Sequence, residues 1–131
     1  MAFTHSITQS WSGGAGSTAL NVEVSQSADS EQNLSTTVET GVTDGEATLS
    51  VDFSAMLALY ISSTEDILIE TNDGTTPDDA LTITADVPLV WTYASGITNP
   101  ITADIVTNIF ITNASGSTAT VEIRILQDGT P

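Results

Sequence analysis

The chain contains no cysteine and only one lysine or arginine, Arg124, among its 131 residues. Without cysteine it can form neither disulfides nor thiolate metal sites, which fits assembly in a reducing cytoplasm. Seventeen aspartates and glutamates oppose Arg124, so the formal net charge is −16. Such a surface cannot neutralise nucleic-acid phosphates, which requires clustered basic residues, and it is repelled by anionic lipid. We therefore expect neither a nucleic-acid nor a membrane partner.

Groups for acid–base or nucleophilic catalysis are equally scarce. His5 is the only histidine, and no G-x-S-x-G element marks a serine as a nucleophile. Glu65-Asp66 and Asp78-Asp79 are adjacent carboxylates in turn-like sequence, whereas glycoside hydrolysis needs two acids at a set separation in a cleft. The chain is therefore predicted not to be an enzyme, with no catalytic residue and no cofactor.

Long apolar segments are absent as well. No apolar run approaches the length of a membrane span. Residues 1–5 lack the basic and apolar regions of a signal peptide. We expect the mature chain to begin near Met1 and to leave the cell, if it does so at all, inside a larger particle.

Hydrophobic residues nevertheless make up 40% of the chain and recur with a period of two, which is typical of β-strands with one buried face. Strands are predicted at residues 3–11, 18–24, 34–40, 47–53, 59–61, 67–69, 81–85, 89–91, 109–111 and 121–126, with a polar loop at 25–33. This pattern predicts an all-β fold, a single-domain β-sandwich or jelly roll of about 8–10 short antiparallel strands spanning residues 1–131.

Local signals add detail. Asp44-Gly45 between two alternating runs is typical of a hairpin, and further hairpins are expected at residues 62–66 and 113–117. One helical turn is expected near Ser54 to Ala58, with Ser54 as a candidate N-cap. The alternating apolar positions of the clearest strands are expected in the core: Leu49, Val51, Phe53, Leu81, Ile83, Ile123 and Ile125.

One loop concentrates oxygen donors that could suit calcium, which takes roughly six to eight oxygen ligands. Its weak calcium candidates are Asn72, Asp73, Asp78 and Asp79. Their spacing does not match an EF-hand loop, and Asn and Asp also favour turns for conformational reasons. A structural turn is the favoured interpretation, and no metal is assigned.

Acidic residues are unevenly distributed along the chain. Residues 1–22 contain none, whereas residues 23–86 hold 14 of the 17. Copies of a chain carrying −16 can approach one another only through faces with little charge, unless salt screens them. Phe3, Ile7 and Trp11 share one alternating face of the first predicted strand and are the candidate contact residues. The same segment could instead be a buried inner strand, and both interpretations stay open.

A succession of short motifs runs through roughly residues 50–127: Asp52-Phe53-Ser54, Ala58-Leu59-Tyr60-Ile61-Ser62-Ser63, Glu70-Thr71-Asn72, Pro77-Asp78-Asp79, Val87-Pro88-Leu89-Val90-Trp91, Asn99-Pro100, Thr102-Ala103-Asp104, Ile111-Thr112-Asn113 and Glu122-Ile123-Arg124-Ile125-Leu126. In this order they resemble small structural proteins of tailed bacteriophages and prophages. Residues 1–40 match nothing in that group. The resemblance implies a virion component, and the size suggests a capsid decoration (cement) protein.

Proteins of this kind are compact β-rich modules that bind the outer capsid surface at symmetry axes, often as trimers, and help the head resist internal pressure. The resemblance therefore implies two partners, the major capsid protein and other copies of the chain in a homotrimer. It also implies assembly in the host cytoplasm and a final place on the capsid surface of the virion. Phe3, Ile7 and Trp11 become the expected capsid or oligomer contacts.

Two other functions stay open. One is a small tail or baseplate protein, which would be present in few copies per particle rather than many. The other is a carbohydrate-binding β-sandwich, in which Trp91 and Tyr93 would form a stacking platform if one strand continues through both. Exposed rings would favour sugar binding, whereas burial of Trp91 would remove the platform.

Overall fold

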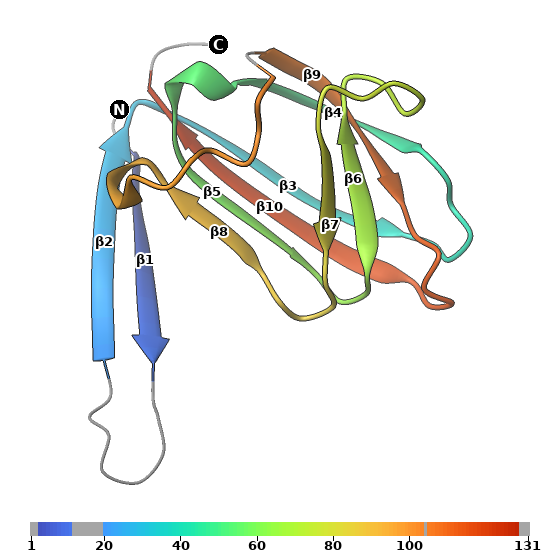
Figure 1. Cartoon of the computed structure of the whole chain (residues 1–131), viewed down its shortest axis with the longest axis horizontal. Coiled ribbons are helices and arrows are strands. Elements are labelled where there is room, and N and C mark those ends of the chain that lie inside the picture. Colours follow the sequence, from blue (N-terminus) through green and yellow to red (C-terminus); the bar gives the residue numbers. More distant parts are fainter. Residues whose placement is uncertain (1–2, 12–19, 104, 129–131) are drawn as a thin grey trace, which may run out of the picture.

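The computed structural model of the protein describes residues 3–11, 20–103 and 105–128. Within them the chain is built from β1 (Phe3–Trp11), β2 (Leu20–Ala28), β3 (Ser30–Val38), β4 (Gly45–Asp52), β5 (Met56–Ser63), β6 (Ile67–Thr71), β7 (Ala80–Ile83), β8 (Leu89–Thr92), β9 (Ile105–Thr112) and β10 (Ala119–Gln127) (Figure 1). The described helical structure is limited to two 3₁₀ turns, Phe53–Ala55 and Tyr93–Ser95. No helix in these residues has the length and apolarity needed to cross a membrane.

Eight of the strands form two facing four-stranded antiparallel sheets. The first, which we call the β10 sheet, has the order β3-β10-β5-β8, and the second, the β9 sheet, has the order β4-β9-β6-β7. From β3 to β6 each strand crosses to the sheet opposite its predecessor, β7 stays beside β6, and from β7 to β10 each strand crosses again. This strand order is that of an eight-stranded jelly roll. The prediction of an antiparallel all-β sandwich is confirmed.

The three hairpins predicted from turn sequences are wrong. β3 and β4, β5 and β6, and β9 and β10 lie in opposite sheets, so each connection is an arch between sheets. Asp44 does adopt the left-handed backbone expected of a turn residue, with φ 51°. A turn residue reverses the chain, but it does not decide whether the returning strand pairs with its neighbour or crosses the core. The hairpins that do form are β1–β2 and β6–β7.

Two boundaries also differ from the prediction. The expected loop at residues 25–33 is mostly strand, because β2 continues to Ala28 and β3 begins at Ser30. The expected helical turn is displaced to Phe53–Ala55, so Ala58 already belongs to β5. Asp52, not Ser54, caps this turn, since its Oδ1 accepts the Ser54 backbone N–H at 3.0 Å.

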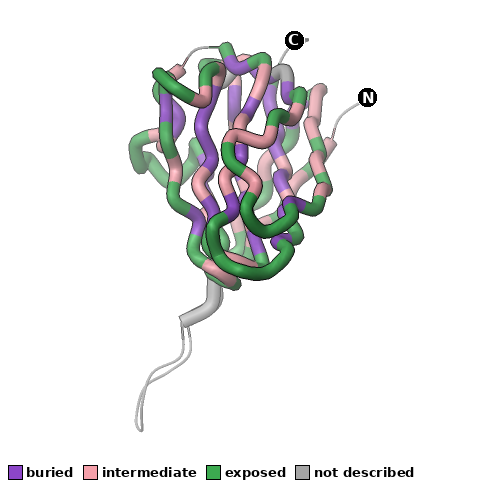
Figure 2. The backbone as a smooth tube through the Cα atoms, turned by 90° about the vertical axis from the view of Figure 1, so that its right-hand side faces the viewer, coloured by how far each residue is buried: buried purple, intermediate pink, exposed green. Residues whose placement is uncertain are grey.

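The core lies between the two sheets, where inward residues of one sheet face those of the other (Figure 2). The predicted positions in β4, β7 and β10 are confirmed in it, because Leu49, Val51, Ile83, Ile123 and Ile125 are buried there. Leu81 is partly buried against the same cluster, and the side chain of Phe53 lies outside the described part of the chain. Alternation therefore located the core residues correctly even where it misjudged the strand pairing.

The β1–β2 hairpin is a separate two-stranded sheet that projects past the sandwich (Figure 1). Its base packs on the outer face of the β10 sheet. There, Phe3 and Ile7 lie against a small second cluster made by Ala28, Ala58 and Leu126. The hairpin is thus an added layer that covers only part of this outer face.

Ile123→Ala tests the core assignment. Ile123 is 2% exposed and pairs with Ile61 across the β10–β5 register, so its truncation should destabilise the fold by about 2–5 kcal/mol. The matched control is Thr120→Ala on the exposed side of the same strand, which should cost less than about 1 kcal/mol. Urea unfolding measures both, and equal stabilities of the two variants would contradict the assignment.

Candidate functional site

Asp79 anchors the loop between β6 and β7. It is 9% exposed, and its carboxylate accepts the backbone N–H groups of Thr102 at 2.9 Å and Ala103 at 3.0 Å. The Thr102 hydroxyl adds a third bond at 2.6 Å, and Thr71 a weaker one. Burial alone would raise the pKa of Asp79, but these hydrogen bonds together hold the pKa below its usual value. Asp79 therefore fixes the β6–β7 loop to the segment that leads into β9.

The remaining calcium candidates are also bonded within the protein. Asn72, at φ 66°, donates from Nδ2 to Asp78 Oδ2 at 2.8 Å and to the carbonyl of Ile105 at 2.9 Å. Asp73 Oδ1 accepts the backbone N–H groups of Thr75 and Thr76, which lower the pKa of Asp73. In the described part of the chain no three His, Asp or Glu side chains gather closely enough to hold a metal ion. The geometry favours the structural-turn interpretation of this loop.

One acidic pair could not be recognised in the sequence. Glu70 on β6 is 9% exposed, and burial together with the nearby carboxylates of Asp44 and Asp73 raises its pKa. The β6–β7 loop closes over Asp44, because a Cβ added to Gly74 would lie 2.8 Å from Asp44 Cγ. Glu70 and Asp44 are far apart in the chain, and only the sheet order brings them together. The pair is a source of like-charge repulsion on this face.

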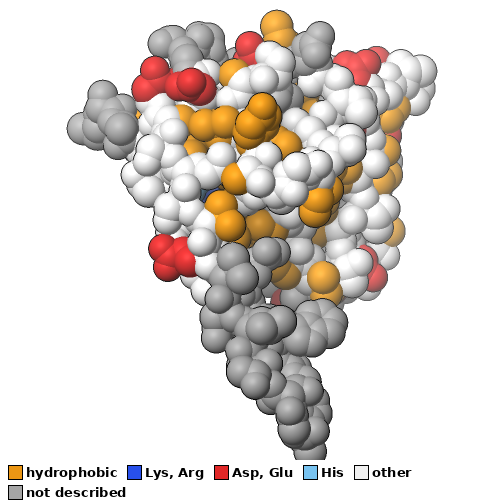
Figure 3. Space-filling model, turned by 60° about the vertical axis from the view of Figure 1, so that its left-hand side comes forward, with side chains coloured by type: hydrophobic (Ala, Val, Ile, Leu, Met, Phe, Trp, Pro, Cys, Tyr) orange, Lys and Arg blue, Asp and Glu red, His pale blue; other side chains and the backbone are white. Residues whose placement is uncertain are grey.

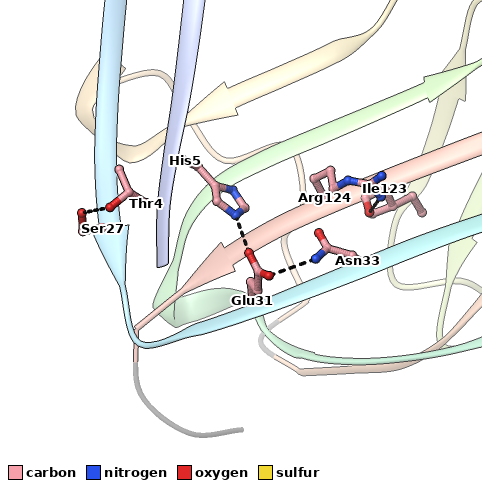
Figure 4. A network of polar contacts seen from close by, with 7 residues as sticks. All are labelled: Thr4, His5, Ser27, Glu31, Asn33, Ile123 and Arg124. Atoms are coloured by element: carbon pink, nitrogen blue, oxygen red, sulfur yellow. Dashed lines mark hydrogen bonds and ion pairs between the residues drawn. The ribbon is translucent and has the colours of Figure 1, made fainter. Parts of the chain in front are cut away.

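His5 is a structural link between the hairpin and the sandwich. Its Nε2 lies 2.9 Å from Glu31 Oε2, which joins β1 to the start of β3 (Figure 4). Thr4 and Ser27 share a hydrogen bond across the hairpin at 2.8 Å. Arg124 on β10 pairs with Glu122 at 2.9 Å.

The candidate contact residues are partly engaged by the protein itself. Phe3 and Ile7 are half-buried and face the sandwich, and the side chain of Trp11 lies outside the described part. Thr4, Ser6 and Thr8 form the exposed side of β1, so hydroxyl groups line the free face of this strand. The role of Phe3, Ile7 and Trp11 in contacts remains a prediction.

Trp91 and Tyr93 do not form a platform. β8 ends at Thr92, and a 3₁₀ turn follows, so Trp91 is buried while Tyr93 is 67% exposed. Trp91 Nε1 donates to the Ile97 carbonyl at 2.8 Å, which fixes the ring under this turn. The expectation that both rings share one strand face is wrong, and the carbohydrate-binding alternative loses its stacking surface.

Tyr93 and Ile97 expose apolar surface beside an open hollow of about 660 Å³ over Trp91. Hydrophobic side chains gather on the side of the molecule nearest the hairpin, and acidic side chains lie around the periphery in this view (Figure 3). The chain matches no protein-family model, no curated protein and no solved structure. Function must therefore be argued from this surface and its charge.

Asp79→Asn should lower the free energy of unfolding by about 1.5–3 kcal/mol at neutral pH, the size of hydrogen bonds to charged groups. Because the pKa of Asp79 is lowered in the fold, its stabilisation is complete above the usual aspartate pKa and is lost as the pH falls through the folded value. The variant and the parent should therefore converge in acid. Urea titrations at several pH values measure the difference, and a pH-independent gap would contradict the assignment.

Glu70→Gln should raise the stability of the fold at neutral pH, which is the opposite of the effect of Asp79→Asn. The pKa of Glu70 is raised in the fold, so its ionised carboxylate destabilises the protein. This destabilisation is absent below the usual glutamate pKa, and it is complete once the pH has risen through the higher pKa of the folded state. At neutral pH the variant should melt at a higher temperature than the parent, and in acid at the same temperature. Thermal unfolding across this pH range checks it, and a lower melting temperature at neutral pH would refute the repulsion argument.

Proposed function

We propose that the protein is a non-enzymatic structural protein of a bacteriophage virion, a capsid decoration (cement) protein that binds the outer surface of the head and stabilises it. The observation that carries this proposal is the division of the molecule into a strongly acidic jelly roll and a projecting hairpin whose first strand has no acidic residue. Its partners would be the major capsid protein and other copies of the chain, and assembly would take place in the host cytoplasm.

The polar groups of the jelly roll support a structural role. The calcium candidates Asp79 and Asn72 and the single histidine His5 each hold two segments of the chain together. Hydrogen-bonded links of this kind make a rigid module. A decoration protein that stabilises a shell against internal pressure has to be rigid in this way.

Charge supports the hairpin as the docking segment. At a net charge of −16 the chain repels any other acidic surface, so close contact is easiest through a segment free of carboxylates. β1 is such a segment, and the hairpin that contains it projects past the sandwich beyond its packed base (Figure 1). The place in the virion rests on the resemblance of residues 50–127 to phage structural proteins. A tail or baseplate location is the competing proposal.

Cryo-electron microscopy of particles purified from cells that make this protein tests the location. A decoration protein should occupy many symmetry-related positions on the outside of the head. Density confined to a few copies at the tail would replace the head assignment with the tail alternative. Particles that lack the protein altogether would refute a virion role.

Trp11→Ala should weaken binding to purified heads about tenfold or more, because aromatic anchors often dominate interface energy. The matched control is Tyr93→Ala, which removes an aromatic ring that is 67% exposed on the sandwich and should bind heads as the parent does. Co-sedimentation of each variant with heads measures the two affinities. If only Tyr93→Ala loses binding, the contact with the head lies on the sandwich and not on the hairpin.

A further inference from the structure

The outer edge of β1 is an unused pairing surface. β1 and β2 pair in an uninterrupted antiparallel register from Phe3↔Ala28 to Trp11↔Leu20, and β1 has no second strand partner in the described residues. A two-stranded sheet is only marginally stable by itself in water. Its free backbone N–H and C=O groups are a template for a further strand.

β1 is also the least protected edge strand of the described fold. Natural edges are blunted by charge, bulges or short length. β2 and β3 carry Glu23 and Glu31, and β4 carries Glu46 and Asp52 together with a register shift against β9. β7 and β8 have only four residues each. β1 alone combines nine residues with no Asp, Glu, Lys or Arg.

Space for an added strand lies beside this edge. A groove of about 270 Å³ separates His5 and Ile7 on β1 from Ala58, Tyr60 and Arg124 on the outer face of the β10 sheet. The hairpin covers the Ala58 end of that face and leaves the strip over Tyr60 and Arg124 open. A strand added to β1 would fill the groove and extend the hairpin layer over this strip.

We propose that β1 of a second copy of this chain occupies the edge, in an antiparallel strand pair. The edge suits a second copy, because two chains at −16 meet here through the same nine-residue strand, which carries no acid. A twofold axis at Ile7, the midpoint of Phe3–Trp11, pairs both strands over their full length and sets Ser6 opposite Thr8 of the second copy. The result is a dimer, in place of the trimer that the resemblance implies, and it does not depend on a capsid.

Sedimentation equilibrium of the purified full chain tests this contact. The parent should form a concentration-dependent dimer. Ser6→Glu with Thr8→Glu sets like charges directly opposite one another in the pair and should raise the dimer dissociation constant about tenfold or more. The control, Ser25→Glu with Ser27→Glu, adds the same charge to exposed positions of β2, opposite Ser6 and Thr4 of the same hairpin, and should leave the constant unchanged.

A charge-swap variant separates edge pairing from general repulsion. Ser6→Lys with Thr8→Lys, mixed with the β1 glutamate variant, should give a mixed dimer tighter than either variant alone. Circular dichroism melts establish that all variants are folded. A parent that stays monomeric at millimolar concentration, a trimer, or equal weakening by the β1 and β2 glutamates would each overturn the proposal.

Discussion

The scarcity of positive charge determines how this protein stabilises its carboxylates. One arginine cannot neutralise 17 acids, so a buried carboxylate must be held by backbone amides and hydroxyl groups. Asp79 has such donors from Thr102 and Ala103 and has a lowered pKa. Glu70 is instead buried with no such donor among the described residues, and this burial together with the nearby carboxylates of Asp44 and Asp73 raises its pKa. Asp79 therefore has the hydrogen-bond donors that a buried carboxylate needs in a chain with so few basic residues, whereas Glu70 lacks them in the described part of the chain.

The same constraint governs what the protein can approach. Charge repels the sandwich from other acidic surfaces, including copies of itself, except where carboxylates are missing. In the described hairpin, β1 carries no carboxylate and β2 carries one, Glu23, and the hairpin is fixed to the body by Phe3, Ile7 and the His5–Glu31 contact. Under the proposed function, the acidic jelly roll would keep molecules apart and the carboxylate-free strand β1 would make the specific contact.

Alternation predicted much of this fold because burial on one sheet face is a local property of a strand. Val51, Ile83 and Ile123 are buried as their alternation predicts. Strand pairing could not be predicted, because a turn such as Asp44-Gly45 serves a hairpin and an arch between sheets equally well. The Asp79–Thr102 bonds and the Glu70–Asp44 pair arise only when the sheet order joins distant segments, so no local signal indicated them. The expected Trp91–Tyr93 face failed because β8 ends at Thr92.

The central claim is that the hairpin, and not the sandwich, makes the functional contact. Amide hydrogen exchange tests it most directly, measured on the dilute free chain and on the chain bound to virus particles. The account predicts that amides of β1 gain protection in the bound state while those of β4 and β7 exchange unchanged. Unaltered exchange along β1, with new protection around Tyr93 and Ile97, would contradict it.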